Sequence, residues 1–189
     1  MIMCVRRELF PSSRCLFMYR DVVAIAKSCY RNSMVRPSWR LEYLLGHFSR
    51  HLSKSISYPL GFDLCIRLDN DLMLGVLLPA MKIAIYLDLR RRGFDVSAVR
   101  YEDLVARPLD MCRIILEFCH LPVSLAELGI KAFDVDSQAN SLTPNSTVRH
   151  FKEPQLTPQI KTKLNEILEK WGVPLIGEPN IIEGTLSLC

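Results

Sequence analysis

The stretch of the chain that most constrains the fold is RCLFMYRDVVAIAKSCYR, residues 14–31, where the spacing of apolar residues changes abruptly. Residues 15–19 are apolar without interruption, which is typical of a strand covered on both faces of a sheet. After them the apolar residues follow the period of one helix face, at Val22, Ile25, Ala26 and Cys29. Asp21 suits the N-cap, because its carboxylate can accept a hydrogen bond from a first-turn amide. The stretch therefore predicts a strand, a sharp turn and a helix.

A second strand and several helices are predicted downstream. We expect a largely buried helix at residues 72–90, closed by three arginines and by Gly93. DVSAVRYEDL, residues 95–104, returns to an extended pattern, in which Glu102 and Asp103 would point to opposite faces of a strand. Further helices are expected near residues 41–52, from Pro108 to a point before Pro122, and from Thr157 to Gly172.

This order of elements predicts an α/β fold with a parallel sheet flanked by helices. A chain of 189 residues suits one domain, residues 1–189, of which residues 174–189 are expected to be an irregular tail. Ligands of such sheets bind beyond the carboxyl ends of the strands. Arg20 and Tyr101 both follow a predicted strand, so we expect the functional site there.

The composition argues against wholesale binding of nucleic acid and against a metal site. The formal charge of +4 is too small to indicate wholesale nucleic-acid binding, so any anion site must be local. Seven cysteines occur without a CxxC pair or histidines at ligand spacing, so we predict reduced thiols and no metal.

Residues 72–87, LMLGVLLPAMKIAIYL, are the one apolar stretch that resembles a membrane segment. They are shorter than the roughly 20 residues that a span needs, and Pro79 and Lys82 interrupt them. We therefore predict a buried helix and no membrane span. No apolar stretch of signal-peptide length follows Arg6 and Arg7, so no secretory signal is expected either.

Arg20 and Ser28 suggest a phosphate site at the start of the first helix. A helix N-terminus favours a phosphate group, and a guanidinium offers a planar fork of donors. Ser28 lies seven residues after Asp21, so it falls on the same side of the helix about two turns along. Spacing alone leaves another interpretation open, in which Arg20 pairs with a carboxylate such as Asp21 or Glu102 and Ser28 is an ordinary helix residue.

Two stretches resemble motifs of the sulfotransferases that use 3′-phosphoadenosine 5′-phosphosulfate (PAPS). RDVVAIAKS is similar to the family's 3′-phosphate-binding motif, an arginine at a strand end and a serine eight residues later, here Arg20 and Ser28. VRYEDLVARPLDMCRIILEFCHLP, residues 99–122, resembles a second family stretch whose tyrosine lies near the adenine, here Tyr101. DSQANSLTPNSTVRHF resembles the loop that closes over the cofactor, although the family's RKG-type segment is absent. Arg149 could replace its phosphate-contacting arginine, or be a solvated loop residue.

The resemblance implies a P-loop-NTPase-like sulfotransferase fold and transfer of a sulfuryl group from PAPS to a hydroxyl or amine. The acceptor would be a small molecule or a carbohydrate, the product adenosine 3′,5′-bisphosphate, and no metal would take part. The family's GxxRSGTT-type loop for the 5′-phosphosulfate and its catalytic base are not found in this sequence, so no catalytic residue is assigned. We therefore expect a domain that is incomplete at its N-terminus, with exposed strand edges that favour self-association.

Two other interpretations stay open. The chain could be a truncated isoform or pseudoenzyme that acts as a nucleotide-binding or interaction fragment. It could also be related to nucleotide kinases of the P-loop architecture, although their lysine-bearing phosphate loop is equally absent. The compartment is open between the cytoplasm and, if an anchor precedes these residues, the Golgi lumen.

Overall fold

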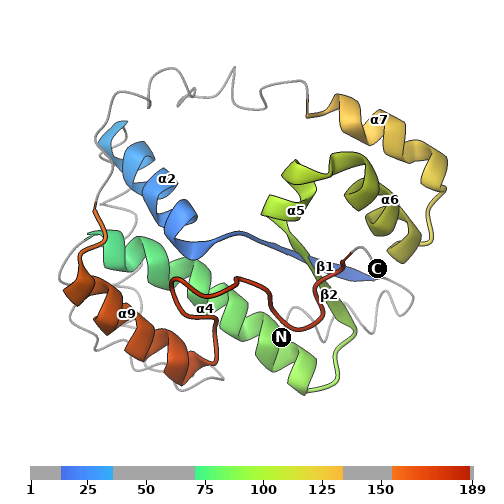
Figure 1. Cartoon of the computed structure of the whole chain (residues 1–189). Coiled ribbons are helices and arrows are strands. Elements are labelled where there is room, and N and C mark those ends of the chain that lie inside the picture. The colour runs from blue at the N-terminus through green and yellow to red at the C-terminus, as the bar shows by residue number, and fades with distance from the viewer. Residues whose placement is uncertain (1–13, 36–70, 134–154, 188–189) are drawn as a thin grey trace, which may run out of the picture. The chain divides into compact units, whose positions relative to one another are not determined.

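The computed structural model describes residues 14–35, 71–133 and 155–187 of the chain, and these fall into two units. Of the described residues, the first unit holds 14–20, 86–133 and 181–187, and the second holds 21–35, 71–85 and 155–180. Figure 1 labels the helices and strands of both units. The helix expected near residues 41–52 lies outside the described residues.

The sheet of the first unit contains β1 (Cys15–Tyr19) and β2 (Val96–Arg100), which pair in parallel as predicted. Cys15 lies opposite Val96, and Tyr19 lies opposite Arg100. On the other edge of β2, the amide of Ala98 donates to the carbonyl of Gly184 at 2.9 Å. The carbonyl of Ala98 accepts from the amide of Leu186 at 2.8 Å. β2 therefore has a partner on each edge, and the C-terminal residues extend the ladder.

Helices pack against both faces of β2. Partners in a parallel register share a face, so Phe17 and Ala98 lie on one face and Val99 on the other. On the first face, the ring of Phe17 stacks on that of Tyr86, at the end of α4 (Asp71–Arg91), with 4.9 Å between centroids. On the second face, Val99 is buried in a cluster with Leu104 and Met111. The mixed α/β class with a parallel sheet is thus confirmed.

The expectation that residues 15–19 are covered on both faces is wrong. Their exposure alternates, and Leu16 and Met18 are 37% and 56% exposed. These two side chains lie on the same face as Val99, but the apolar cluster on that face gathers around β2. The unbroken apolar run therefore predicts the strand correctly, but it does not show that both faces of the strand are covered.

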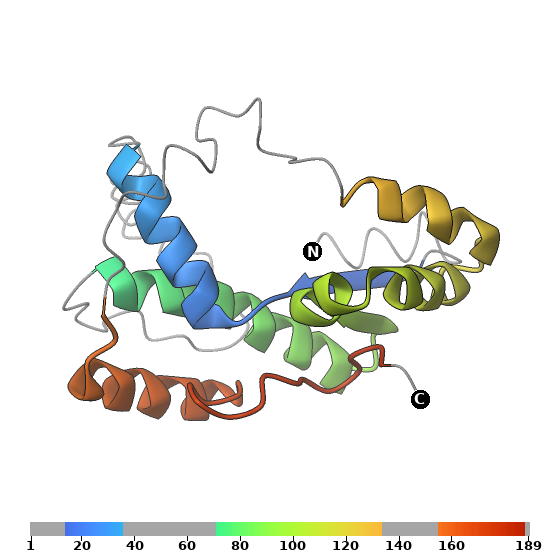
Figure 2. The same ribbon diagram turned by 45° about the horizontal axis from the view of Figure 1, so that its top comes forward.

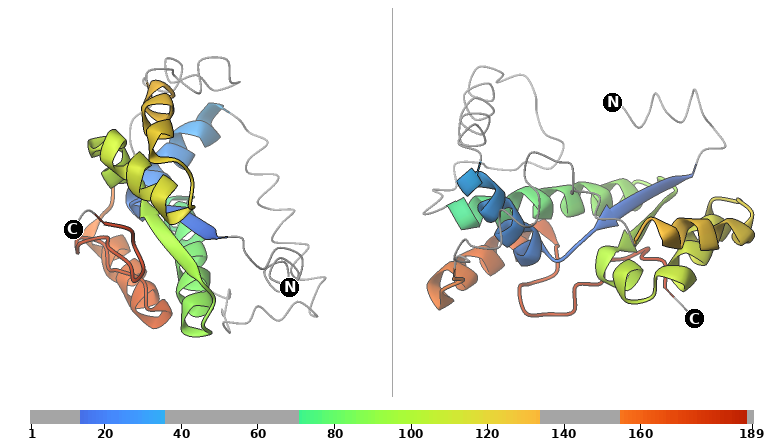
Figure 3. Two further views of the ribbon diagram at one scale, coloured as in Figure 1. Left: turned by 90° about the vertical axis from the view of Figure 1, so that its right-hand side faces the viewer. Right: turned by 90° about the horizontal axis from the view of Figure 1, so that it is seen from above.

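Four short helices follow β2 in the first unit, and α5 begins directly after its last residue. They are α5 (Tyr101–Ala106), α6 (Pro108–Phe118), η1 (Val123–Leu125) and α7 (Ala126–Lys131). The expected strand positions of Glu102 and Asp103 are wrong, because both lie in the first turn of α5, where acidic side chains favour a helix. α6 begins at Pro108 as predicted, and α7 packs against α6 (Figure 3).

The second unit consists of α2 (Val22–Val35), the first part of α4, and α9 (Pro158–Trp171). α2 and α9 flank α4 on opposite sides (Figure 2). A Cβ added to Gly75 of α4 would lie 3.1 Å from the Cα of Ala26, so only glycine allows α2 to come this close. On α9, Leu164 and Leu168 are fully buried.

The predicted helix ends agree with the structure. The amide of Ala24 donates to the Asp21 carboxylate at 2.7 Å, which confirms Asp21 as the N-cap of α2. α9 starts after Thr157, whose side chain accepts from the amide of Ile160 at 3.4 Å, and it ends at Gly172 with φ 65°. α4 ends at Arg91, and Gly93 follows with φ 78°. Over the described ranges, none of the helices, α4 included, has the length and apolar character needed to cross a membrane.

Candidate functional site

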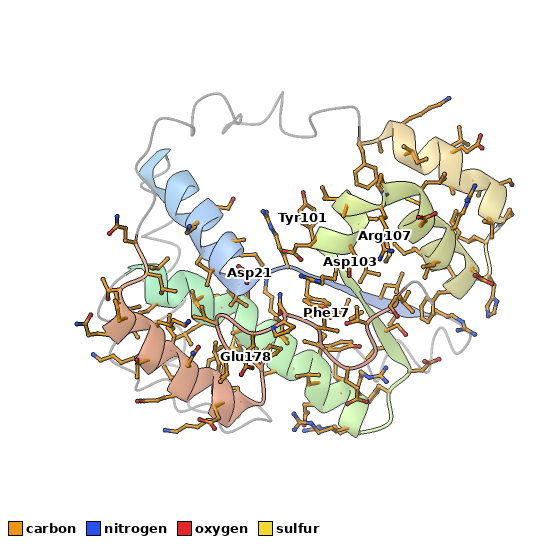
Figure 4. All side chains as sticks on the ribbon, in the orientation of Figure 1. Phe17, Asp21, Tyr101, Asp103, Arg107 and Glu178 are labelled. Carbon is orange, nitrogen blue, oxygen red and sulfur yellow. The ribbon has the colours of Figure 1, made fainter. Side chains whose placement is uncertain are left out.

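The carboxyl ends of the two strands bring Arg20 and Tyr101 together. Because Tyr19 lies opposite Arg100, the residues that follow them leave the sheet at the same end. The guanidinium carbon of Arg20 lies 4.8 Å from the centroid of the Tyr101 ring, which is cation–π geometry. Figure 4 shows Tyr101 at the start of α5. The Arg20 side chain is 42% exposed and Tyr101 is 37% exposed, so a ligand has access to both.

Glu102 links Arg20 to a second arginine. Its Oε1 lies 3.9 Å from Nε of Arg20, and its Oε2 lies 3.6 Å from Nε of Arg100. Asp103 adds a contact from its Oδ1 to Nη1 of Arg100 at 3.6 Å. These distances exceed those of hydrogen bonds, so the groups attract one another electrostatically without direct donation.

The ion pair with Glu102 tests the interpretation in which Arg20 only pairs with a carboxylate and binds no ligand. The pair exists, but its 3.9 Å separation and partial exposure place it among contacts worth about 0–1 kcal/mol. Nε of Arg20 is shielded and forms no hydrogen bond within the described part of the chain. The guanidinium therefore stays accessible to an anion.

The structure describes Ser28 in a different unit from Arg20. Ser28 lies on α2, about two turns after the N-cap Asp21, and its side chain is partly buried. The convergence of Arg20 and Ser28 on one phosphate stays a prediction. Arg149 lies outside the described residues, and so does the loop that contains it.

Two tyrosines fix the strand end next to Arg20 by binding the C-terminal residues. The hydroxyl of Tyr19 lies 2.9 Å from Oγ1 of Thr185 and accepts from the amide of Ile182 at 3.4 Å. The hydroxyl of Tyr86 donates to the carbonyl of Glu183 at 2.9 Å. Burial raises the pKa of Tyr86 above its ordinary value, so the phenol stays a neutral donor near pH 7. The contacts of Tyr19 tie the last residue of β1, directly before Arg20, to the C-terminal residues.

The sequence offered Glu102 as one possible partner of Arg20, but it did not place Arg100 in the site. Arg100, Glu102 and Asp103 bring opposite charges close together in the sequence at a strand end. This spacing was the sequence feature that could have indicated their contacts. In the structure both acidic residues contact Arg100.

Neither a metal cluster nor a known relative helps to define the site. Within the ranges that the structure describes, no group of three or more His, Cys, Asp and Glu side chains could hold a metal ion. The chain matches no protein-family model, no curated protein and no solved structure. The functional conclusion therefore depends on the chemistry of the strand ends.

Proposed function

We propose that the chain is a sulfotransferase-like protein that binds a 3′-phosphorylated adenine nucleotide, either PAPS or adenosine 3′,5′-bisphosphate, on a P-loop-NTPase-like fold. The observation that carries the proposal is the Arg20 guanidinium, accessible and 4.8 Å from the Tyr101 ring centroid beyond two parallel strands. A phosphate needs a cationic fork of donors, and an adenine needs an aromatic or apolar surface. The pair offers both within one small area.

Each residue has a separate role in the proposed complex. Arg20 donates to the 3′-phosphate, and Ser28 supplies a hydroxyl from α2. Tyr101 lies beside the adenine, and Arg149 provides a further phosphate contact. The amide of Ala24 already donates to the Asp21 carboxylate, so this first-turn amide is not assigned to the phosphate.

The family reaction sets what a complete active site would do. The acceptor oxygen or nitrogen attacks the sulfur of PAPS, the bond from sulfur to the bridging phosphate oxygen breaks, and the acceptor proton passes to a base. Positive groups stabilise the departing oxygen as negative charge develops there. These 189 residues contain no GxxRSGTT-type loop to supply such groups, so nucleotide binding without transfer is the second candidate for this chain.

Calorimetric titration of the full chain with two nucleotides tests the proposal. Adenosine 3′,5′-bisphosphate and adenosine 5′-monophosphate differ only in the 3′-phosphate. A charge-assisted phosphate contact contributes about 1.5–3 kcal/mol, so we expect the bisphosphate to bind about 10- to 150-fold more tightly. Equal affinities, or no binding of the bisphosphate, would contradict the proposed function.

A further inference from the structure

Glu102 lies between the two arginines at the strand ends, and Arg20 is the more exposed of the two. One carboxylate oxygen lies 3.6 Å from Nε of Arg100, and the other lies 3.9 Å from Nε of Arg20. Arg100 is the last residue of β2 and belongs to the ladder opposite Tyr19. The Glu102 carboxylate is thus attracted to Arg100, at the end of β2, on one side and to Arg20 on the other.

We propose that Glu102 is a positioning residue that holds the Arg20 guanidinium over the Tyr101 ring, an inference that rests on the proposed nucleotide site. Tyr101 restricts the guanidinium from one face, and Glu102 attracts it through Nε. Glu102 contacts Nε of Arg20, so the two terminal nitrogens keep the fork geometry that a phosphate accepts. A contact through Nε therefore orients Arg20 without using the donors that bind ligand.

Arg100 keeps Glu102 in this role, because its Nε lies 3.6 Å from Oε2 of Glu102. Asp103, in the same first turn of α5, contacts Arg100 at Nη1 and not at the Nε that faces Glu102. The charges of Arg20 and Arg100 balance those of Glu102 and Asp103. The Arg20 side chain is the most exposed of the four, so a ligand phosphate has the best access to its guanidinium.

If Glu102 competed with the ligand for Arg20, removing its charge would change nucleotide affinity in the opposite direction. If Glu102 only competed with the phosphate for Arg20, removing its charge would strengthen nucleotide binding. If Glu102 positions Arg20, removing its charge weakens binding, because the long side chain regains its rotamer freedom. The effect of Glu102→Gln on affinity distinguishes the two roles directly.

A binding cycle on the full chain tests the proposal, with adenosine 3′,5′-bisphosphate as the ligand. We expect Glu102→Gln to weaken binding about two- to fivefold, as suits a partly exposed ion pair, and to leave adenosine binding unchanged. In the Arg20→Ala background, Glu102→Gln should have no further effect, because it acts through Arg20. Asp103→Asn is the matched control, since it removes one charge from the same helix turn at a residue that contacts Arg100 and not Arg20.

Unchanged or tighter binding by Glu102→Gln would overturn the proposal, and so would an equal loss in Asp103→Asn. A second measurement does not need the nucleotide. NMR of the Arg20 Nε–H group should show a ring-current shift from Tyr101 in the parent and in Asp103→Asn, and a smaller shift with greater mobility in Glu102→Gln. A parent that binds no nucleotide but gives this pattern would refute the proposed function and keep the positioning role. An Arg20 signal that Glu102→Gln leaves unaltered would refute the positioning role alone.

Discussion

Replacing Gly184 with alanine should destabilise the protein through the backbone and through Arg90. Gly184 has φ +76°, a left-handed conformation that costs a residue with a Cβ about 1–2 kcal/mol. The added Cβ would lie 2.5 Å from Cζ and Nη1 of Arg90. Nη1 donates to the carbonyl of Val96, so the guanidinium has to leave that carbonyl. Losing a hydrogen bond from a charged group costs about 1.5–3 kcal/mol.

Gly93 offers a matched control for this substitution. Its φ is +78°, almost the same as that of Gly184, but a Cβ there would meet nothing within 4 Å. Gly93→Ala should therefore cost only the backbone term of about 1–2 kcal/mol. Gly184→Ala should cost about 2.5–5 kcal/mol in total, because the two terms add.

The assay is equilibrium unfolding in urea, followed by far-ultraviolet circular dichroism, on the parent and the two variants. The free energy of unfolding should fall further for Gly184→Ala than for Gly93→Ala, by about 1.5–3 kcal/mol. Equal losses in the two variants would refute the reasoning, since the backbone conformation alone would then account for the loss in free energy of unfolding, without a contribution from the contact with Arg90.

Three further predictions concern local features. Burial raises the folded-state pKa of Tyr86 above 10.0, so the stability that this phenol contributes is present below pH 10 and is lost as the pH rises beyond it. In thermal denaturation across pH 8–11, the stability of Tyr86→Phe should therefore fall less at high pH than that of the parent. Equal falls in stability would contradict this. Asp21→Ala should lower the free energy of unfolding by about 1 kcal/mol through the lost cap of α2, whereas Asp21→Asn, which keeps an acceptor, should lose less; similar losses would count against the cap. Leu16→Ser with Met18→Ser should reduce self-association in sedimentation velocity at nearly constant thermal midpoint, because both side chains are exposed, and unchanged association would show that this face is not involved.

The local parts of the fold could be read from the sequence. The change of apolar period at Asp21 predicted the end of β1 and the start of α2, because both depend on neighbouring residues. Proline and glycine marked the start of α6 and the end of α9 for the same reason. Such signals act over a few residues and do not need the rest of the chain.

The contacts that depend on distant residues could not be read in this way. Leu16 and Met18 are exposed because the helices on their face pack around β2, which the sequence of β1 does not encode. The addition of Gly184 and Leu186 to the edge of β2 is equally long-range.

The candidate site shows the same division. A strand end before Arg20 and another before Tyr101 were predictable, but their meeting depends on the register of Tyr19 with Arg100. The pair of Arg20 with Glu102 was one interpretation that the sequence left open, but the further link from Glu102 to Arg100 was not expected, because α5 was predicted to start as a continuing strand. The side chains that carry the chemistry were thus identifiable, whereas the orienting role proposed for Glu102 depends on contacts that only the fold shows.

Titration calorimetry of Arg20→Ala, Ser28→Ala and the double variant with adenosine 3′,5′-bisphosphate tests most directly whether both residues bind one phosphate. Arg20→Ala should lose about 1.5–3 kcal/mol of binding free energy, and the loss in the double variant should differ from the sum of the single losses, because the two residues share a ligand group. Wild-type affinity in Arg20→Ala would remove the guanidinium from the site. Additive losses would separate Ser28 from the phosphate that Arg20 binds.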